Sequence, residues 1–165
     1  MRDFVLRRAS EFSKVEIARF ESIVKDAGEV SANAINGLLA HNPLLRFYPN
    51  TNEIQAVGAL KIPNEGYRER IFKEKACVDI ENIENLEELG WIVSLNPGQG
   101  IGSFVTEQLA LSGKSIYATV REENKSMKGI LLKNGFTQEG KAYNSERGDY
   151  KLLLFVKQDA QAGTE

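Results

Sequence analysis

The chain has 165 residues, about one domain, and its 42% hydrophobic and 27% charged residues are typical of a folded globular protein. No apolar run approaches the roughly 20 residues that span a bilayer, so we expect no membrane partner. Its 21 Lys and Arg nearly balance 23 Asp and Glu, which argues against nucleic acid as a required partner, because phosphate binding needs a cationic surface.

One cysteine excludes an internal disulfide, and one histidine argues against a metal site built from Cys and His ligands. The first residues carry charges where a secretory signal needs an apolar stretch, so we expect a cytoplasmic protein without a bound metal. No repeat or linker is visible. We expect one domain over residues 1–158 and a loose tail over 159–165. The oligomeric state stays open, a homodimer included.

The first part of the chain predicts one strand and two helices. Residues 3–9 have the composition of a strand. Ser13 followed by Glu16 three residues later forms a capping box, so a helix is expected from there to Gly28. A second helix is expected over 31–41, and His41 at its end suits the negative end of the helix dipole.

The middle of the chain predicts a hairpin, a helix and a buried strand. Residues 44–48 and 53–62 are extended runs joined by turn residues. Residues 67–76 have helical spacing, and 86–95 ends in a nearly continuous apolar run, as a strand buried on both faces does. The glycine-rich turn 97–102 follows.

The last part predicts a helix over 102–113, a strand over 115–120, a helix that Asn124 could cap, and a hairpin of 136–143 with 150–157. A strand, a glycine turn, a helix and another strand form a parallel crossover unit. The hairpins on either side make the sheet mixed and mostly antiparallel. The predicted fold class is therefore α/β, a central sheet with flanking helices.

The turn Pro97-Gly98-Gln99-Gly100-Ile101-Gly102 is the sharpest motif in the chain. Glycine lacks a Cβ, so the backbone can approach a ligand, and the N–H groups at the start of the following helix attract an anion such as pyrophosphate. The alternative is a plain strand-to-helix turn. A dinucleotide fingerprint fails because Val105 stands where its last glycine belongs, and a P-loop fails because Gln108 stands where its first glycine belongs.

Two motifs in order resemble those of the GNAT superfamily of acyl-CoA-dependent N-acyltransferases. A strand ending near Val93 leads into the glycine turn, and Val120-x-x-x-Asn124 follows about twenty residues later. A helix carrying Met127 then ends in Gly135-Phe136. The resemblance is clear over about residues 86–136, and it implies a GNAT-like fold with acetyl-CoA as co-substrate.

The resemblance also implies which residues bind the cofactor and what reaction follows. The acyl group would pass directly to a primary amine of a small molecule or protein. A backbone N–H on the strand would stabilise the oxyanion, and pantetheine would lie where strand 89–95 splays from strand 115–120. The implied cofactor-binding residues are Trp91, Ile92, Val93, Ser94, Leu95, Gly98, Gln99, Gly100, Ile101, Gly102, Asn124 and Ser126.

The sequence departs from the family pattern at two informative places. Pro97 stands where the family usually has Arg or Gln, and Leu131 stands where it often has the tyrosine that protonates the departing thiolate. Tyr143 and Tyr117 are candidate substitutes, with ordinary strand aromatics as the alternative. Because a thiol is already fairly acidic, we expect transfer without a dedicated acid.

Glu87 and Glu88 open the buried strand and are candidates for the general base that takes the amine proton. Strand alternation sends them to opposite faces, so one at most serves, and Glu88 is our choice. The alternative is that both are solvated carboxylates. Cys77 is expected to be a small buried side chain rather than a nucleophile.

Two residues of the next motif have structural alternatives. Asn124 is implied to contact the cofactor, and it could equally be a helix N-cap. Ser126 could hydrogen-bond the CoA sulfur or be an exposed serine of the first helical turn. A CoA-binding or CoA-sensing module without turnover is the alternative function, and a plain interaction domain would require that acetyl-CoA does not bind.

Overall fold

The computed structural model describes residues 5–28, 32–79, 85–113 and 115–158. In this part of the chain, seven strands form a sheet in the order β1-β2-β3-β4-β5-β7-β6. Strands β4 and β5 pair in parallel, while β1–β2, β2–β3, β5–β7 and β6–β7 pair antiparallel. The predicted α/β fold with a mixed, mostly antiparallel sheet is confirmed.

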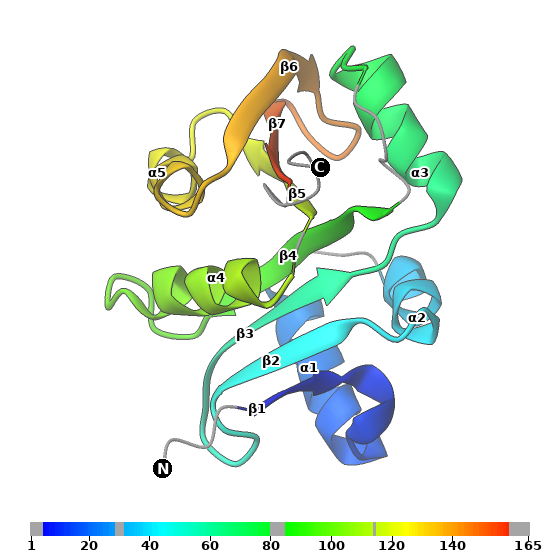
Figure 1. Ribbon diagram of the computed structural model, residues 1–165. Helices are drawn as coiled ribbons and strands as arrows, with labels where there is room; N and C mark the ends of the chain where they lie inside the picture. Colours follow the sequence, from blue (N-terminus) through cyan, green and yellow to red (C-terminus); the bar gives the residue numbers. More distant parts are fainter. Residues whose placement is uncertain (1–4, 29–31, 80–84, 114, 159–165) are drawn as a thin grey trace, which may run out of the picture. The chain divides into compact units, whose positions relative to one another are not determined.

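The chain divides into two compact units. The first is Met1–Ile62 with Leu89–Ser112, and the second is Pro63–Glu88 with Gly113–Glu165. The first unit contains β1 (Val5–Arg8), the 3-10 helix Ala9–Glu11, α1 (Lys14–Asp26), α2 (Ala32–Ala40), β2 (Leu44–Pro49), β3 (Ile54–Lys61), most of β4 (Glu87–Ser94) and α4 (Ile101–Ser112) (Figure 1).

Helix α1 begins at the predicted capping box. The Ser13 Oγ accepts a hydrogen bond from the Glu16 N–H at 3.2 Å, and the Glu16 Oε1 accepts one from the Ser13 N–H at 2.8 Å. The helix ends before Gly28, whose φ of 75° is the left-handed conformation that glycine adopts without strain. Both ends of this helix therefore follow from local sequence.

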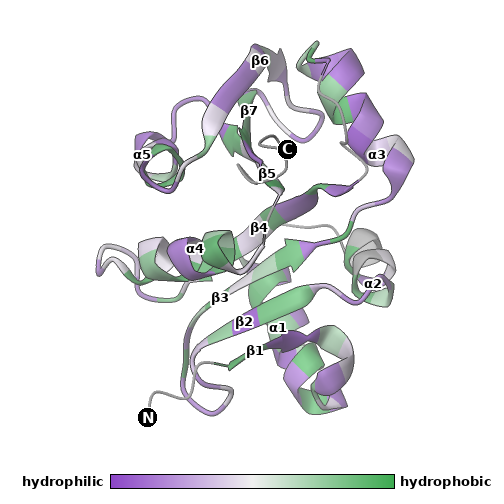
Figure 2. Cartoon of the chain, in the orientation of Figure 1, coloured by the Kyte–Doolittle hydropathy of each residue, from purple (hydrophilic) through white to green (hydrophobic). Residues whose placement is uncertain are grey.

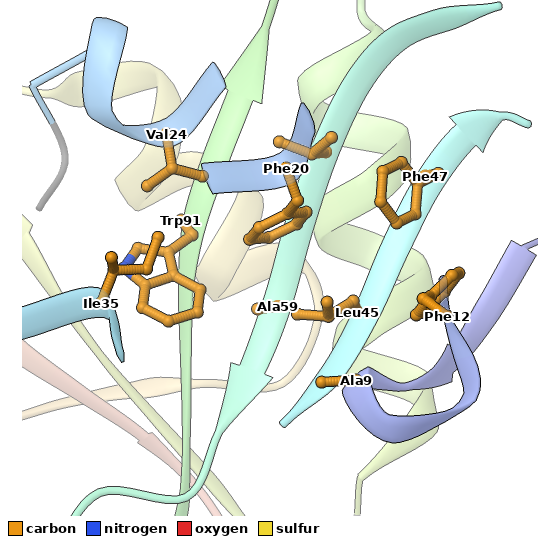
Figure 3. Close-up of a cluster of buried hydrophobic side chains, with 10 residues drawn as sticks. Ala9, Phe12, Phe20, Val24, Ile35, Leu45, Phe47, Ala59 and Trp91 are labelled. Atoms are coloured by element: carbon orange, nitrogen blue, oxygen red, sulfur yellow. The ribbon is translucent and has the colours of Figure 1, made fainter. Parts of the chain in front are cut away.

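An aromatic cluster fills the face of the first unit that α1 and α2 cover. The Phe20 ring of α1 lies edge-on to Phe47 of β2 and to Trp91 of β4, with centroids 5.6 and 5.8 Å apart. Ile35 of α2 is fully buried in the same cluster (Figure 3). This packing fixes β4 against β2 and β3 through side chains as well as through the sheet.

Helix α4 covers the other face of these strands, and Gly58 lets it approach. A Cβ at Gly58 would lie 2.6 Å from Ile92 Cδ1 and 2.7 Å from Leu109 Cδ1. Beside it, the buried Arg46 donates from Nε to Gln108 Oε1 of α4 at 2.8 Å. Burial lowers the pKa of Arg46 from its ordinary value. The middle and the end of α4, the helix that follows the glycine turn, are therefore held against β2 and β3.

The second unit packs a helix on a four-stranded part of the sheet. Its helix begins at Asn64, whose Oδ1 accepts from the Tyr67 N–H at 2.9 Å, and continues as a π-helix that the sequence did not predict. Figure 2 shows α3 as mostly hydrophilic. The elements of this unit are α3 (Glu65–Glu69), η2 (Arg70–Lys75), the start of β4, β5 (Ile116–Arg121), α5 (Lys125–Lys133), β6 (Thr137–Asn144) and β7 (Lys151–Lys157).

The core of the second unit lies between η2 and the strands. Phe72 of η2 stands edge-on to Tyr117 of β5, with centroids 5.2 Å apart. The end of η2 also meets β6 through the backbone, because the Lys141 N–H donates to Ala76 O at 2.9 Å. Gly140 allows this contact, since its φ is 71° and an added Cβ would collide with the Ala76 carbonyl oxygen.

None of the helices in the described part of the chain has the length and apolar character that a bilayer-spanning helix needs. One expectation about burial is wrong. Cys77 is exposed, because Ala76 takes the buried position at the end of η2 and the chain then turns away, with Cys77 itself at a φ of 57°. Residues 159–165, the expected tail, lie outside the described residues.

Candidate active site

The glycine turn joins β4 to the first residue of α4, as predicted. Gly98 and Gly100 have φ values of 92° and 75°, so each needs the freedom of glycine. A Cβ at either position would have no protein atom within 4 Å, which leaves the space beside the turn open. The helix begins where the Phe104 N–H donates to Gly100 O at 3.1 Å. The first-turn N–H groups and the helix dipole therefore face an open, exposed turn.

The end of β4 supplies one polar group to this region. The Ser94 Oγ is buried and has no hydrogen-bond partner among the described residues. Its Cβ lies 3.8 Å from the position that a Gly102 Cβ would occupy, so Ser94 stands beside the first turn of α4. The Leu95 N–H donates to Gln55 O at 2.8 Å. A donor without a partner and an open glycine turn fit a pyrophosphate-bearing ligand.

Trp91 gives β4 an irregularity that the sequence did not predict. Its φ of 53° lies in the left-handed region, which is a strained conformation for a bulky residue in a strand. The side chain is held there by burial against Phe20 and by Lys61, whose Nζ lies 5.0 Å from the ring centroid. Such a kink re-aims the backbone groups that follow it. The half-buried Ile92 side chain packs onto Gly58 of β3.

Glu88 is buried in the second unit, with 5% of its surface exposed. It lies in register with Tyr117 on the neighbouring parallel strand, so the two side chains share one face of the sheet. Glu87 is half-buried and points the other way. The alternative of a solvated carboxylate is therefore wrong for Glu88.

Three tyrosines surround this carboxylate. Burial raises the pKa of Tyr67, Tyr117 and Tyr143 above the ordinary value, and the negative charge of Glu88 raises each further. The Tyr67 hydroxyl also forms a hydrogen bond with Glu88, which stabilises its protonated form. All three phenols are therefore neutral hydrogen-bond donors at physiological pH.

A buried arginine completes this group. Arg68 is 8% exposed, and its guanidinium donates to Leu86 O at 3.0 Å. Its charge lowers the pKa of Tyr117, against the larger effects of burial and Glu88. The Tyr143 hydroxyl has no hydrogen-bond partner among the described residues. Glu88 and Tyr143, both predicted from sequence, are thus brought together, while Tyr67 and Arg68 were not predicted, because no spacing links them to Glu88.

Asn124 and Ser126 lie at the start of α5. The Asn124 Oδ1 accepts from the Met127 N–H at 3.1 Å, so this residue is the predicted N-cap. Ser126 is exposed. Leu131 is fully buried on the same helix, so a packing residue occupies the position where the family resemblance implies a tyrosine. Whether either polar residue contacts a cofactor stays a prediction.

His41, the one histidine of the chain, has a structural position. The His41 Nδ1–H donates to Ile62 O at 2.8 Å, which ties the end of α2 to the end of β3. Among the residues that the structure describes, no His, Cys, Asp and Glu side chains gather in a group that could hold a metal ion. The predicted divergence of strand 89–95 from strand 115–120 involves both units and stays a prediction.

The comparisons with known proteins show the fold. No protein-family model matches the chain, and no curated protein matches its sequence. Solved structures do. The chain is similar to an acyl-CoA N-acyltransferase from Pseudomonas aeruginosa, with 14% identity, a TM-score of 0.65, and coverage of 94% of this chain and 98% of that one.

Two further structures agree. The chain is similar to an acetyltransferase of the GNAT family from Streptococcus pneumoniae, with 14% identity, a TM-score of 0.57, and coverage of 94% and 99% of the two chains. It is also similar to Arabidopsis thaliana NAA60 in complex with acetyl-CoA, with 13% identity, a TM-score of 0.63, and coverage of 94% and 99%. The protein therefore has the fold of the GNAT acyltransferases, as its two motifs predicted.

Proposed function

We propose that the protein is an acetyl-CoA-dependent N-acetyltransferase that moves an acetyl group directly to a primary amine. The observation that carries the proposal is the open glycine turn at Gly98 and Gly100, placed between β4 and the start of α4. A helix start with unpaired N–H groups is an anion site. This turn supports the binding of a pyrophosphate group. The fold supports acyl-CoA as the ligand, because acyl-CoA is an acyl carrier that contains a pyrophosphate.

The residues that would hold the co-substrate belong to β4, the turn and α5. Backbone groups of β4 from Trp91 to Leu95 would pair with an extended ligand arm, and the turn would bind the pyrophosphate. When bound, acetyl-CoA supplies the thioester whose acyl group is transferred. The Asn124 Oδ1 already accepts a hydrogen bond from the Met127 N–H, so a contact of Asn124 with the co-substrate would come in addition to this capping bond.

Glu88 would accept the proton that the acceptor amine must lose, directly or through water. Glu88 is buried, and the neutral phenols of Tyr67 and Tyr143 lie close enough for its charge to act on them, so the carboxylate has a polar environment. No cysteine is placed to carry the acyl group, since Cys77 is exposed and its sulfur lies near backbone carbonyls of Glu74 and Lys75.

Tyr143 is a weak acid for this reaction. Its pKa lies well above its ordinary value, and a thiol has a pKa of about 8.5 by comparison with cysteine. Proton transfer from the phenol to a thiolate is therefore uphill, and the leaving group needs little assistance. We propose that transfer proceeds without a dedicated acid and that Tyr143 acts as a hydrogen-bond donor toward the acceptor.

A CoA-binding module without turnover is the second candidate, favoured by the buried Leu131 at the position of the family's tyrosine. Thiol release from acetyl-CoA, measured with a panel of primary amines, distinguishes the enzyme from the binding module. An enzyme releases thiol in an amine-dependent way and yields an acetylated amine. Binding of acetyl-CoA without amine-dependent release across the panel would favour the module. A cytoplasmic site of action completes the proposal.

A further inference from the structure

A pocket of about 290 Å³ lies in the second unit, between η2 and the β6–β7 hairpin. Its walls carry four charged side chains, Glu74 and Lys75 from η2, Lys141 from β6 and Lys151 from β7. Three ammonium groups against one carboxylate give the pocket a positive charge. A pocket of this size suits a small molecule rather than a protein surface.

One of these lysines, Lys75, already forms an ion pair. The Lys75 Nζ lies 3.0 Å from Glu146 Oε1, and this ion pair joins η2 to the loop after β6. The hydrogen bond from Lys75, together with its charge, lowers the pKa of Glu146. Lys141 and Lys151 form no ion pair with any residue that the structure describes. An anion in the pocket would therefore meet two available ammonium groups and compete with Glu146 for the third.

Tyr143 connects this pocket to the Glu88 cluster. It lines the pocket, it is only 8% exposed, and its buried hydroxyl has no partner among the described residues. Its ring belongs to the same buried cluster as Tyr117, which is the register partner of Glu88 on the neighbouring strand. The pocket thus offers cationic side chains, and one of its lining residues belongs to the buried cluster beside the proposed base.

We propose that this pocket is the acceptor subsite for a small primary amine that carries a carboxylate. The inference rests on the proposed function and names its substrate class. Glu74 favours a substrate with both an ammonium and a carboxylate, and it disfavours a doubly charged phosphate. The carboxylate of the substrate would pair with Lys141 and Lys151, and its amine would point toward Glu88.

The first test is calorimetric titration of the full chain with glutarate, a dicarboxylate without an amine, at low ionic strength. We expect binding that the double substitution Lys141→Gln with Lys151→Gln weakens about tenfold, since each exposed lysine contributes a few-fold. Glu146→Gln should tighten it about twofold by releasing Lys75. Lys73→Gln is the matched control, because Lys73 is exposed on the same η2 and does not line the pocket.

The second test compares γ-aminobutyrate with γ-aminobutyramide, which differ in the carboxylate, as acceptors in thiol release. We expect a higher kcat/KM for γ-aminobutyrate, and a difference that the double lysine variant abolishes. Release with no preference, together with no binding of glutarate, would overturn the subsite and leave the acetyltransferase standing. Glutarate binding that depends on the lysines, without binding of acetyl-CoA, would keep an anion site and end the proposed function. Equal effects of Lys73→Gln and the double variant would also overturn the subsite.

Discussion

Glu88 of β4 and Tyr117 of β5 are partners in a parallel register, and both side chains are buried on the face that η2 covers. The carboxylate raises the pKa of the phenol beyond the effect of burial alone. Burying a charged group costs free energy, so packing alone does not explain why this carboxylate lies among neutral hydrogen-bond donors. This relationship makes Glu88 the side chain on which the proposed chemistry depends.

Glu88→Gln keeps the shape of the side chain and removes its basicity. We expect kcat/KM to fall about 10²-fold, as for loss of a general base, while the affinity for acetyl-CoA hardly changes. The measurement is thiol release against pH, with Glu87→Gln as the matched control on the opposite face. An unaltered pH–rate profile in Glu88→Gln would remove Glu88 from the mechanism.

Tyr143→Phe deletes one hydroxyl. We expect kcat to fall less than about tenfold, because the phenol is a poor proton donor to a thiolate. Acetyl-CoA affinity, measured by calorimetry, should be preserved. A loss of about 10³-fold or more in a folded variant would show that Tyr143 does protonate the leaving group.

The tyrosine cluster predicts a loss of stability at alkaline pH. In the unfolded chain a tyrosine loses its proton near pH 10, and in the folded protein Tyr117 keeps it to higher pH. The folded state then binds more protons than the unfolded state, so stability is full below about pH 10 and falls as the pH rises above it.

Urea midpoints of the wild type and Tyr117→Phe, followed from about pH 8 to about pH 11, test this prediction. The wild type should lose more stability than the variant over the upper part of that range. Lysine titration contributes equally to both proteins and cancels in the difference. Parallel curves would show that Tyr117 titrates normally in the folded protein.

Gly140 predicts a large cost of adding one methyl group. Gly140→Ala strains a φ of 71° and drives a Cβ into the Ala76 carbonyl oxygen, so we expect a loss of about 3 kcal/mol or more. Gly28→Ala is the matched control. Its φ is 75° and its Cβ would meet nothing, so about 1 kcal/mol of strain is expected. Equal losses in urea unfolding would mean that the contact of β6 with Ala76 does not constrain the fold.

Local signals in the sequence were sufficient for most elements. The capping pair Ser13 and Glu16 and the N-cap Asn124 act within one helical turn, and the structure has both as predicted. Gly98 and Gly100 adopt the left-handed backbone that a glycine-rich turn indicates. Each of these depends on residues a few positions apart, which a sequence shows directly.

The remaining features depend on tertiary packing. Tyr67 reaches Glu88 because its helix packs on the sheet, and no pattern in the chain records that contact. Trp91 is held at a positive φ by neighbours from α1 and β3, whereas its residue type predicts an ordinary strand. Cys77 was misplaced because Ala76 fills the buried position next to it.

Calorimetric titration with acetyl-CoA tests the central claim, that the glycine turn binds an acyl-CoA. The wild type should bind with a measurable heat, and Gly100→Val should bind at least about tenfold more weakly while remaining folded, because the side chain strains a φ of 75° and fills the open space beside the turn. Binding should also raise the melting temperature of the wild type, as any ligand of the native state does. The absence of heat with the wild type at millimolar acetyl-CoA, or undiminished binding by a folded Gly100→Val, would contradict the account.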